Sequence, residues 1–289
     1  MDDILVQGFL MGGVIALVAL GFILVFKSSG VLNLAHGEMI AILAYFLYQL
    51  LAIWDLPAWL GILVAVPTGA LLGVLIERLA VRPLLGQPFL SVLMMTLMVS
   101  FLLRGVRYLA WGPDSYILPF TPRGQWEIGP VNVIPATAIS FVAAIFIFVV
   151  LLILFRYTKV GLSMRVVSAD HEVAQSLGIR VKQVFSISWA MGGALAAVCG
   201  VLMGMVYTVT PVLGGMVLGA GLPVLLLGGL TSIPGAVVAG LIIGVSTALG
   251  DYYRPGGLNL GEIIAWIVML VILLIRPYGL FGEKRIERI

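Results

Sequence analysis

Residues Ile4–Phe26 read ILVQGFLMGGVIALVALGFILVF, an uncharged stretch of the length that a helix needs to cross a bilayer. The rest of the chain is similar, since 62% of its 289 residues are hydrophobic and 10% are charged. A soluble domain needs more charge to cover its surface. The apolar residues form long runs rather than the short alternating strands of an outer-membrane barrel. The sequence therefore predicts an all-α polytopic membrane protein.

Nine apolar stretches of spanning length follow one another, and we expect them to form a single transmembrane domain over residues 1–289. They cover residues 4–26, 37–54, 58–77, 88–108, 135–155, 184–208, 213–230, 233–250 and 260–276. The seventh and eighth are rich in glycine and separated by only Thr231 and Ser232, so they are also compatible with a broken or re-entrant pair. Because residues 27–38 are similarly ambiguous, the expected number of membrane helices is about eight to ten.

The lysines and arginines predict the orientation, because cytoplasmic loops are enriched in these residues. With loop 156–183 in the cytoplasm and nine alternating spans, all but four of the 16 lysines and arginines lie inside. The four exceptions are Arg104, Arg107, Arg123 and Arg254. The N-terminus is then outside and the C-terminus inside. The acidic start, Asp2 and Asp3, predicts a retained first span rather than a cleaved signal peptide.

The longest outer loop, residues 112–134, is interpreted either as a solvated connector or as part of a docking surface for an extracytoplasmic partner. Arg104 and Arg107 are expected to extend along the membrane to its outer interface. Glu77 and Arg78 are expected to form a local ion pair at the inner surface.

A polar island, Gly161–Ile179, interrupts the apolar runs with the sequence GLSMRVVSADHEVAQSLGI. Apolar residues recur in it at helical spacing and predict one short amphipathic helix. They are Val166, Ala169, Val173 and Leu177. Gly178 is placed to end this helix in the left-handed conformation, with Ile179 following. The helix either lies on the membrane surface or docks in a groove of another protein, and its Asp170 and Glu172, which anionic headgroups repel, favour the protein.

A second polar stretch, Asn33–Glu38, lies in otherwise lipid-like sequence next to Gly30. Glycines permit a break in a membrane helix, which exposes backbone groups able to hold a zwitterionic ligand. By this interpretation a translocation path includes Asn33, His36, Gly37 and Glu38, with Gly228, Gly229 and Thr231 of the glycine-rich region. The equally weighted alternative is a cytoplasmic helix start, with Asn33 as N-cap and Glu38 in the first turn.

Residues 32–43 can be aligned without gaps on residues 230–241, which suggests a weak internal repeat of the kind that transporters contain. Chemistry within the chain is not indicated. There is no G-x-x-x-x-G-K-[ST] phosphate-binding motif, and the single cysteine, Cys199, lies in an apolar run. His36 and Glu38 alone do not make a metal site, and the other histidine, His171, lies in a separate loop. We therefore expect a non-enzymatic protein without a cofactor of its own.

Several stretches resemble the branched-chain amino acid permease family of ABC importers, in its LivH-type subunit. They are Ser29–Glu38 (SGVLNLAHGE), Ser168–Ile179 (SADHEVAQSLGI), Gly192–Gly200, Leu226–Gly235 and Arg276–Phe281. They cover almost the whole chain in the family's order, and Asn33–Glu38 is the most specific. In such permeases the loop corresponding to 156–183 docks on the ATPase. The resemblance thus implies coupling roles for Arg165, Ala169, Asp170, Glu172, Ala174, Gly178 and Ile179. The Glu-Ala-Ala form of other importer classes is replaced here by Ala169-Asp170 and Glu172.

The resemblance also implies partners and a location. The partners are two ATPase subunits that bind ATP and Mg²⁺, a second permease or a second copy, and a periplasmic binding protein, with no nucleic acid. The location is the bacterial inner membrane. The implied cargo is a branched-chain or similar hydrophobic amino acid, with urea, short amides or other small metabolites as alternatives. A stand-alone secondary transporter or channel is the rival class, but apart from Glu38 the chain offers no intramembrane carboxylate for ion coupling.

Overall fold

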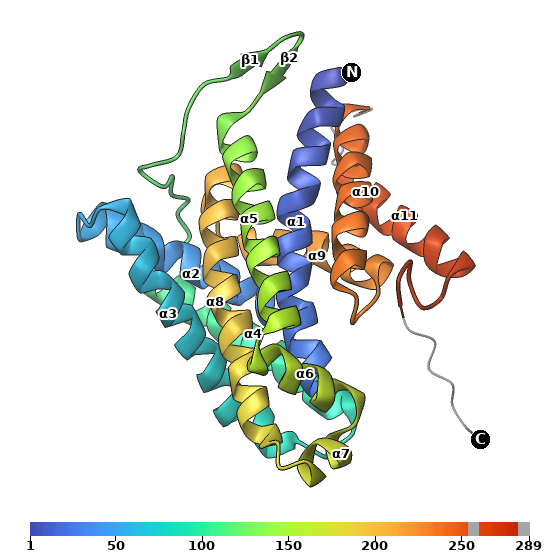
Figure 1. Ribbon diagram of the computed structural model, residues 1–289. Helices are drawn as coiled ribbons and strands as arrows, with labels where there is room; N and C mark the ends of the chain where they lie inside the picture. Colours follow the sequence, from blue (N-terminus) through green and yellow to red (C-terminus); the bar gives the residue numbers. More distant parts are fainter. Residues whose placement is uncertain (254–259, 283–289) are drawn as a thin grey trace.

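The computed structural model describes residues 1–253 and 260–282. Arg254, Lys284, Arg285 and Arg288, used above to predict the orientation, lie outside the described residues. The chain forms a helical assembly with one small hairpin (Figure 1). The first four long helices are α1 (Asp2–Ser29), α2 (His36–Tyr48), α3 (Ala58–Ile76) and α4 (Phe89–Trp111). The others are α5 (Pro135–Tyr157), α6 (Lys159–Ala169), α7 (His171–Ser176), α8 (Val181–Tyr207), α9 (Leu213–Gly228), α10 (Ile233–Tyr252) and α11 (Leu260–Ile275).

Seven of the described helical segments are long and apolar enough to cross a membrane. Two of them include the π-helical extensions Gln49–Ile53 after α2 and Glu77–Val81 after α3. The remaining two apolar helices, α9 and α11, have 16 residues each. At 1.5 Å per residue that is about 24 Å, less than the roughly 30 Å hydrocarbon core. The nine predicted stretches all contain helices, so a polytopic membrane fold is confirmed.

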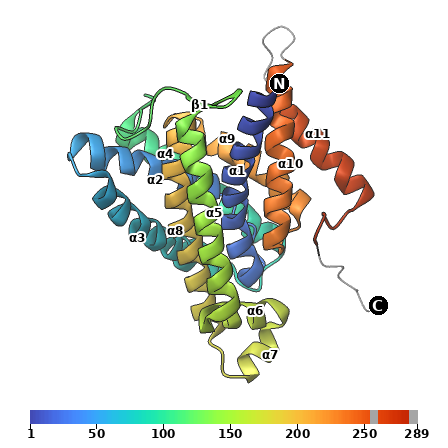
Figure 2. The ribbon, with the colours of Figure 1, turned by 45° about the horizontal axis from the view of Figure 1, so that its top comes forward.

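The core consists of α1, α2 and α8, the most buried of the spanning helices. Because α1 is apolar on all sides, it can be surrounded by other helices. It lies between α5 and α10 in both views of the ribbon (Figures 1 and 2). Glycines set the spacing of α1 and α10: a Cβ on Gly12 of α1 would come 2.5 Å from the Gly240 carbonyl oxygen of α10. Small residues are what allow membrane helices to approach this closely.

The two stretches aligned in the sequence have similar local structure. Gly30 ends α1 with φ +67°, and Gly229 follows α9 with φ +100°. In each case a short turn follows, and a new helix begins at His36 or Ile233. The weak sequence repeat therefore marks two helix breaks.

Loop 112–134, which the sequence predicts to be an outer loop, contains a hairpin that the all-α prediction did not include. Strands β1 (Trp126–Ile128) and β2 (Val131–Val133) are antiparallel and joined by Gly129, with φ +63°, and Pro130. Glycine with positive φ at the first turn position suits a two-residue hairpin. The loop is also attached to the helices, since Tyr116 exchanges two backbone hydrogen bonds of 2.9 Å with Val209.

Candidate functional site

The polar island forms two helices, α6 and α7, at the end of the molecule opposite the hairpin (Figures 1 and 2). Asp170 separates them, with extended backbone. Its Oδ1 accepts hydrogen bonds from the backbone N–H groups of Glu172 (2.7 Å) and Val173 (3.1 Å). The prediction of one continuous helix is therefore wrong, because aspartate is more favourable as the N-cap of a new helix than inside an existing one.

The end of α7 agrees with the prediction. Gly178 has φ +79° and its N–H donates to the Gln175 carbonyl (2.9 Å), while Ile179 N–H donates to the Ala174 carbonyl (3.0 Å). This is the left-handed helix end that glycine favours. The chain reverses there and enters α8.

The short helix α7 has an anchored side and an exposed side. Ala174 is fully buried against the protein, whereas Val173 and Leu177 are 51% and 68% exposed. Exposed apolar side chains at the tip of an otherwise polar loop are suited to contact another protein. The structure thus exposes two apolar side chains in the segment that the sequence predicted to dock on another protein.

The other predicted coupling residues divide between two sides of the loop. Ala169 and Glu172 are exposed next to Asp170, and Ile179 is half-buried at the wall of a cavity of about 330 Å³. Arg165, on α6, lines a different cavity together with Lys27 and Arg156. The structure therefore groups six of the seven predicted residues around α7 and leaves Arg165 apart.

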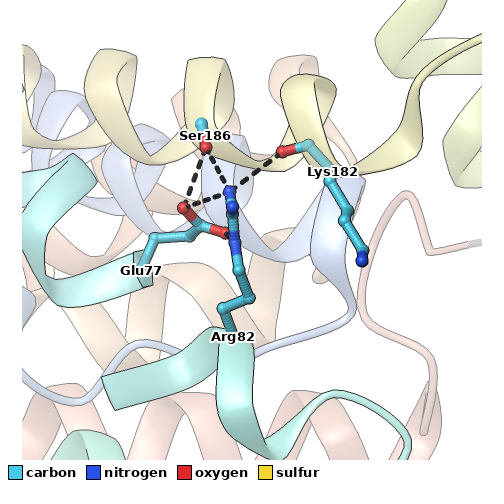
Figure 3. Close-up of polar contacts among 4 residues, drawn as sticks. All are labelled: Glu77, Arg82, Lys182 and Ser186. Atoms are coloured by element: carbon cyan, nitrogen blue, oxygen red, sulfur yellow. Dashed lines mark hydrogen bonds and ion pairs between the residues drawn. The ribbon is translucent and has the colours of Figure 1, made fainter. Parts of the chain in front are cut away.

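A polar network joins the start of α8 to the end of α3 (Figure 3). The buried Glu77 carboxylate accepts two hydrogen bonds from Arg82, of 2.8 and 3.0 Å. Arg82 also donates to the Ser186 hydroxyl (2.7 Å) and to the Lys182 carbonyl (3.4 Å). Ser186 in turn donates to Glu77 (2.9 Å). Because α8 starts just after the turn at Ile179, this network mechanically links α7 to α3.

The predicted Glu77–Arg78 pair is wrong, and the local helix type explains why. Residues 77–81 form a π-helix, in which hydrogen bonds join residues five apart. This winding brings Arg82, rather than the neighbouring Arg78, to the Glu77 carboxylate. Nothing in the sequence marks the π turn.

The break between α1 and α2 is buried and held by α4. Thr96 Oγ1 donates to the Leu32 carbonyl (3.1 Å) and accepts from Leu34 N–H (3.2 Å). Asn33 is buried and its Oδ1 accepts from Ala35 N–H (3.1 Å). The N-cap of α2 is Ala35, not Asn33, so the simple N-cap interpretation of Asn33 is wrong. The asparagine side chain instead accepts a hydrogen bond from a backbone N–H group of the turn that precedes the helix.

Glu38, in the first turn of α2, binds two arginines of α4. Its Oε1 lies 2.8 Å from Arg104, and its Oε2 lies 3.5 Å from Nη2 of Arg107. The Glu38 carboxylate is almost fully buried. A lone carboxylate there would be costly, and the two guanidinium groups offset that cost. The expectation that both arginines extend to the outer interface is therefore wrong.

Arg107 is the more deeply placed of the two arginines. It is fully buried, lies 5.2 Å from the Tyr45 ring centre and 4.9 Å from that of Tyr108, and donates to the Pro211 carbonyl (2.7 Å). Its Nε and Nη1 have no hydrogen-bond partner among the described residues. With one carboxylate and two guanidiniums, the cluster formed by Glu38, Arg104 and Arg107 carries an excess of positive charge. The sequence did contain a signal for this cluster, because Arg104 and Arg107 lie three residues apart in one apolar run and Glu38 lies in another.

His36 does not take part in this cluster. Its ring is fully buried, lies against Gly21 and meets the Phe22 ring edge-on at 4.7 Å between centres. Gly21 leaves the space that the imidazole fills, since a Cβ there would overlap it. Gly37 similarly allows the Gly214 backbone to approach α2. Among residues 1–253 and 260–282, no group of three histidine, cysteine or carboxylate side chains could hold a metal ion.

The remaining predicted path residues lie elsewhere. Gly228 packs on Gly235, while the carbonyls of Leu227 and Gly228 accept hydrogen bonds from the N–H groups of Leu280 (2.7 Å) and Phe281 (3.3 Å). Gly229 contacts Gly282, and Thr231 lines the cavity that contains Arg165. The structure thus brings Asn33, His36, Gly37 and Glu38 together at one break, and Gly228, Gly229 and Thr231 at the other.

Known proteins resemble this one in sequence or in fold. LivH of Salmonella typhimurium, a high-affinity branched-chain amino acid transport system permease protein, is 30% identical over 98% of this chain and 96% of its own. A probable branched-chain amino acid transport permease protein LivH of Methanocaldococcus jannaschii is 31% identical over 95% and 91%. PsaBC from Streptococcus pneumoniae, solved in complex with Fab, shares the fold with a TM-score of 0.53 and 14% identity, over 94% and 90% of the two chains. Residues 4–273 match one sequence family, so the chain belongs to the permease components of branched-chain amino acid transport systems.

Proposed function

We propose that this chain is the membrane subunit of an ATP-driven importer of branched-chain amino acids and that α7 receives the force of the ATPase. The exposed Val173 and Leu177 on the anchored helix α7 carry the proposal. The chain has no phosphate-binding loop, so the nucleotide belongs to a separate subunit. The relatives named above are described as transport permeases for branched-chain amino acids, which supports the cargo.

The proposed coupling path runs from α7 into α8 and on to α3. Docking of an ATPase on the exposed side of α7 moves the turn at Gly178 and with it the first turns of α8. Ser186 and the Lys182 carbonyl then displace Arg82 and Glu77, which lie at the end of α3. Because every member of this network is hydrogen-bonded to at least one other, a movement of α8 also moves the end of α3.

The translocation path proposed here passes the break between α1 and α2. Asn33, Gly37 and Glu38 lie there, and the excess positive charge of the Glu38–Arg104–Arg107 cluster favours the carboxylate of an amino acid over a cation. Arg104 is the exposed member, with 42% of its side chain accessible. Gly228, Gly229 and Thr231 are proposed to line the path at the equivalent break, between α9 and α10. His36 is proposed to support the break between α1 and α2 by packing behind it.

The orientation and partners complete the proposal. The N-terminus and the hairpin lie outside, and α6 and α7 lie in the cytoplasm of a bacterium, with the protein in its inner membrane. Two ATPases dock at α7 of this chain and of a second permease, and a binding protein delivers cargo at the outer loop 112–134. Urea or short amides remain the second candidate cargo, because a carboxylate-free amide could also bind at the polar break.

Co-purification from native membranes, followed by ATP hydrolysis assays, tests the proposal. We expect an ATPase to accompany the chain, and leucine-loaded binding protein to stimulate hydrolysis. If only urea or a short amide stimulated ATP hydrolysis, the assignment as an importer permease would stand, and the proposed cargo would change from an amino acid to that compound. Purification without an ATPase, combined with solute movement that needs no ATP, would overturn the proposal in favour of a secondary transporter.

A further inference from the structure

One seam on the surface of the protein contains two cavities that lie outside the proposed coupling path from α7 through α8 to α3. Residues of α1, α5 and α10 line this seam, and α1 lies between α5 and α10 in both ribbon views (Figures 1 and 2). The upper cavity, of about 310 Å³, is almost entirely apolar. Its lining includes Gly13, Leu17, Phe141, Phe148, Val237 and Leu241.

The lower cavity, of about 450 Å³, lies at the end of the same seam and is basic. Lys27 at the end of α1, Arg156 at the end of α5 and Arg165 on α6 line it, together with Thr231 and Ser232. None of the described residues that line it is acidic. It also contains the first residues of α10, whose helix dipole adds positive potential. These features describe a binding site for an anion.

The two cavities adjoin along the helices. On α5, Phe148 lines the upper cavity and Leu152, four residues later, lines the lower one. On α10, Val237 lines the upper cavity and Ile233, four residues earlier, lines the lower one. Four residues correspond to about 6 Å of helix, little more than one turn. An apolar groove thus leads directly into a basic cavity near the ends of α1 and α5. This order of apolar and cationic surfaces matches a phospholipid, with its acyl chain above and its phosphate below.

The surroundings of the seam favour a lipid as the occupant. Large apolar side chains are exposed on α5, the helix that lines one side of the groove, among them Val142, Phe146 and Val149. Such a surface belongs in hydrocarbon, which brings acyl chains to the groove. Basic cavities between membrane helices on the cytoplasmic side are suited to anionic headgroups.

We propose that the α1–α5–α10 seam binds one anionic phospholipid, with its phosphate between Arg156 and Arg165 and one acyl chain between Phe148 and Val237. The assignment to the cytoplasmic leaflet rests on the orientation in the proposed function. Lipid binding itself does not, because the seam lies within this single chain. The lipid joins α5, which leads into the coupling loop, to α10, and so stabilises the position of α6.

Native mass spectrometry of the purified chain with added palmitoyl-oleoyl phosphatidylglycerol tests the proposal. We expect one tightly bound lipid and a higher unfolding temperature. The double variant R156Q/R165Q should bind about 25-fold more weakly, since each basic side chain near a membrane surface contributes roughly a fivefold preference. The matched variant R78Q/R180Q removes two exposed arginines outside the seam and should bind as wild type does.

Three outcomes would overturn the proposal. Equal binding of phosphatidylcholine would show that charge is not recognised. Equal stabilisation by inorganic phosphate would show an anion site without an acyl groove. Unchanged lipid binding in R156Q/R165Q would place the lipid elsewhere. None of these assays needs an ATPase, so failure here leaves the importer proposal intact, and failure of the importer proposal leaves the lipid site intact.

Discussion

Glu38 lies between two helices that have no other ion pair between them among the described residues, and its carboxylate faces Arg104 and Arg107. Removing one partner of a buried ion pair lowers stability much more than replacing both partners with apolar residues, because the remaining charge is left without compensation. The buried Arg107 would keep only the Pro211 carbonyl and two aromatic rings. The side chain of Glu38 is therefore expected to be necessary for the packing of α2 on α4.

For Glu38→Gln we predict a loss of about 3 kcal/mol or more in the free energy of unfolding, since Gln cannot neutralise two guanidiniums. Unfolding of the purified protein in detergent, followed by circular dichroism, measures the change. Glu262→Gln is the control, because Glu262 is exposed on α11. Equal stability of the two variants would show that the cluster does not hold α2.

Ser186 is the α8 side chain that contacts the Glu77–Arg82 pair, next to the backbone carbonyl of Lys182. We predict that Ser186→Ala lowers stability by about 1–3 kcal/mol, because hydrogen bonds to two charged groups are lost. Ser246→Ala, which removes only a hydroxyl bonded to its own helix at the Ile242 carbonyl, should change stability by less than about 0.5 kcal/mol. Thermal unfolding distinguishes them. A larger loss in Ser246→Ala would contradict the role of the network.

At the scale of elements, glycines decide how closely α1 and α10 pack. A Cβ on Gly12 would meet backbone atoms of Gly240 and Leu241 at 2.5 and 2.8 Å. Backbone cannot move aside as a flexible side chain can. The two helices must therefore separate if Gly12 is enlarged.

We accordingly predict that Gly12→Ala lowers the free energy of unfolding by about 1–3 kcal/mol. Gly105→Ala on α4, where an added Cβ meets nothing within 4 Å, should be tolerated. The yield of folded protein in detergent and its unfolding temperature report both. If Gly12→Ala were as stable as Gly105→Ala, the α1–α10 contact would be looser than described.

Sequence patterns predicted the long helices well and the short polar segments less well. Apolar runs such as Ile4–Phe26 have only one stable form in a bilayer, so their helices could be predicted. The split of the island at Asp170 depends on a local competition between capping and helix continuation, which periodicity alone does not measure. Charged residues within apolar runs mark the members of the Glu38–Arg104–Arg107 cluster, but Glu38 is more than sixty positions from the arginines, and no spacing rule indicates that they meet.

At the scale of the whole molecule, the proposed orientation places the hairpin and α7 on opposite sides of the membrane. Cys199, the single cysteine, is fully buried and should react little with a membrane-impermeant thiol reagent. We predict that Ser115→Cys in the outer loop is labelled in intact cells, and that Ser176→Cys on α7 is labelled only after permeabilisation. Both serines are exposed. The reverse pattern would invert the orientation.

The central claim is that force enters through α7 and is carried onward by the turn at Gly178. ATP-dependent leucine uptake into proteoliposomes, containing this chain with its partner subunits, tests it most directly. Gly178→Pro, which cannot adopt φ +79° and removes the N–H bonded to Gln175, should abolish uptake while the complex still assembles. Gly86→Pro, at the similar φ of +89° in another loop, should retain most of it. Wild-type uptake by Gly178→Pro would contradict the account.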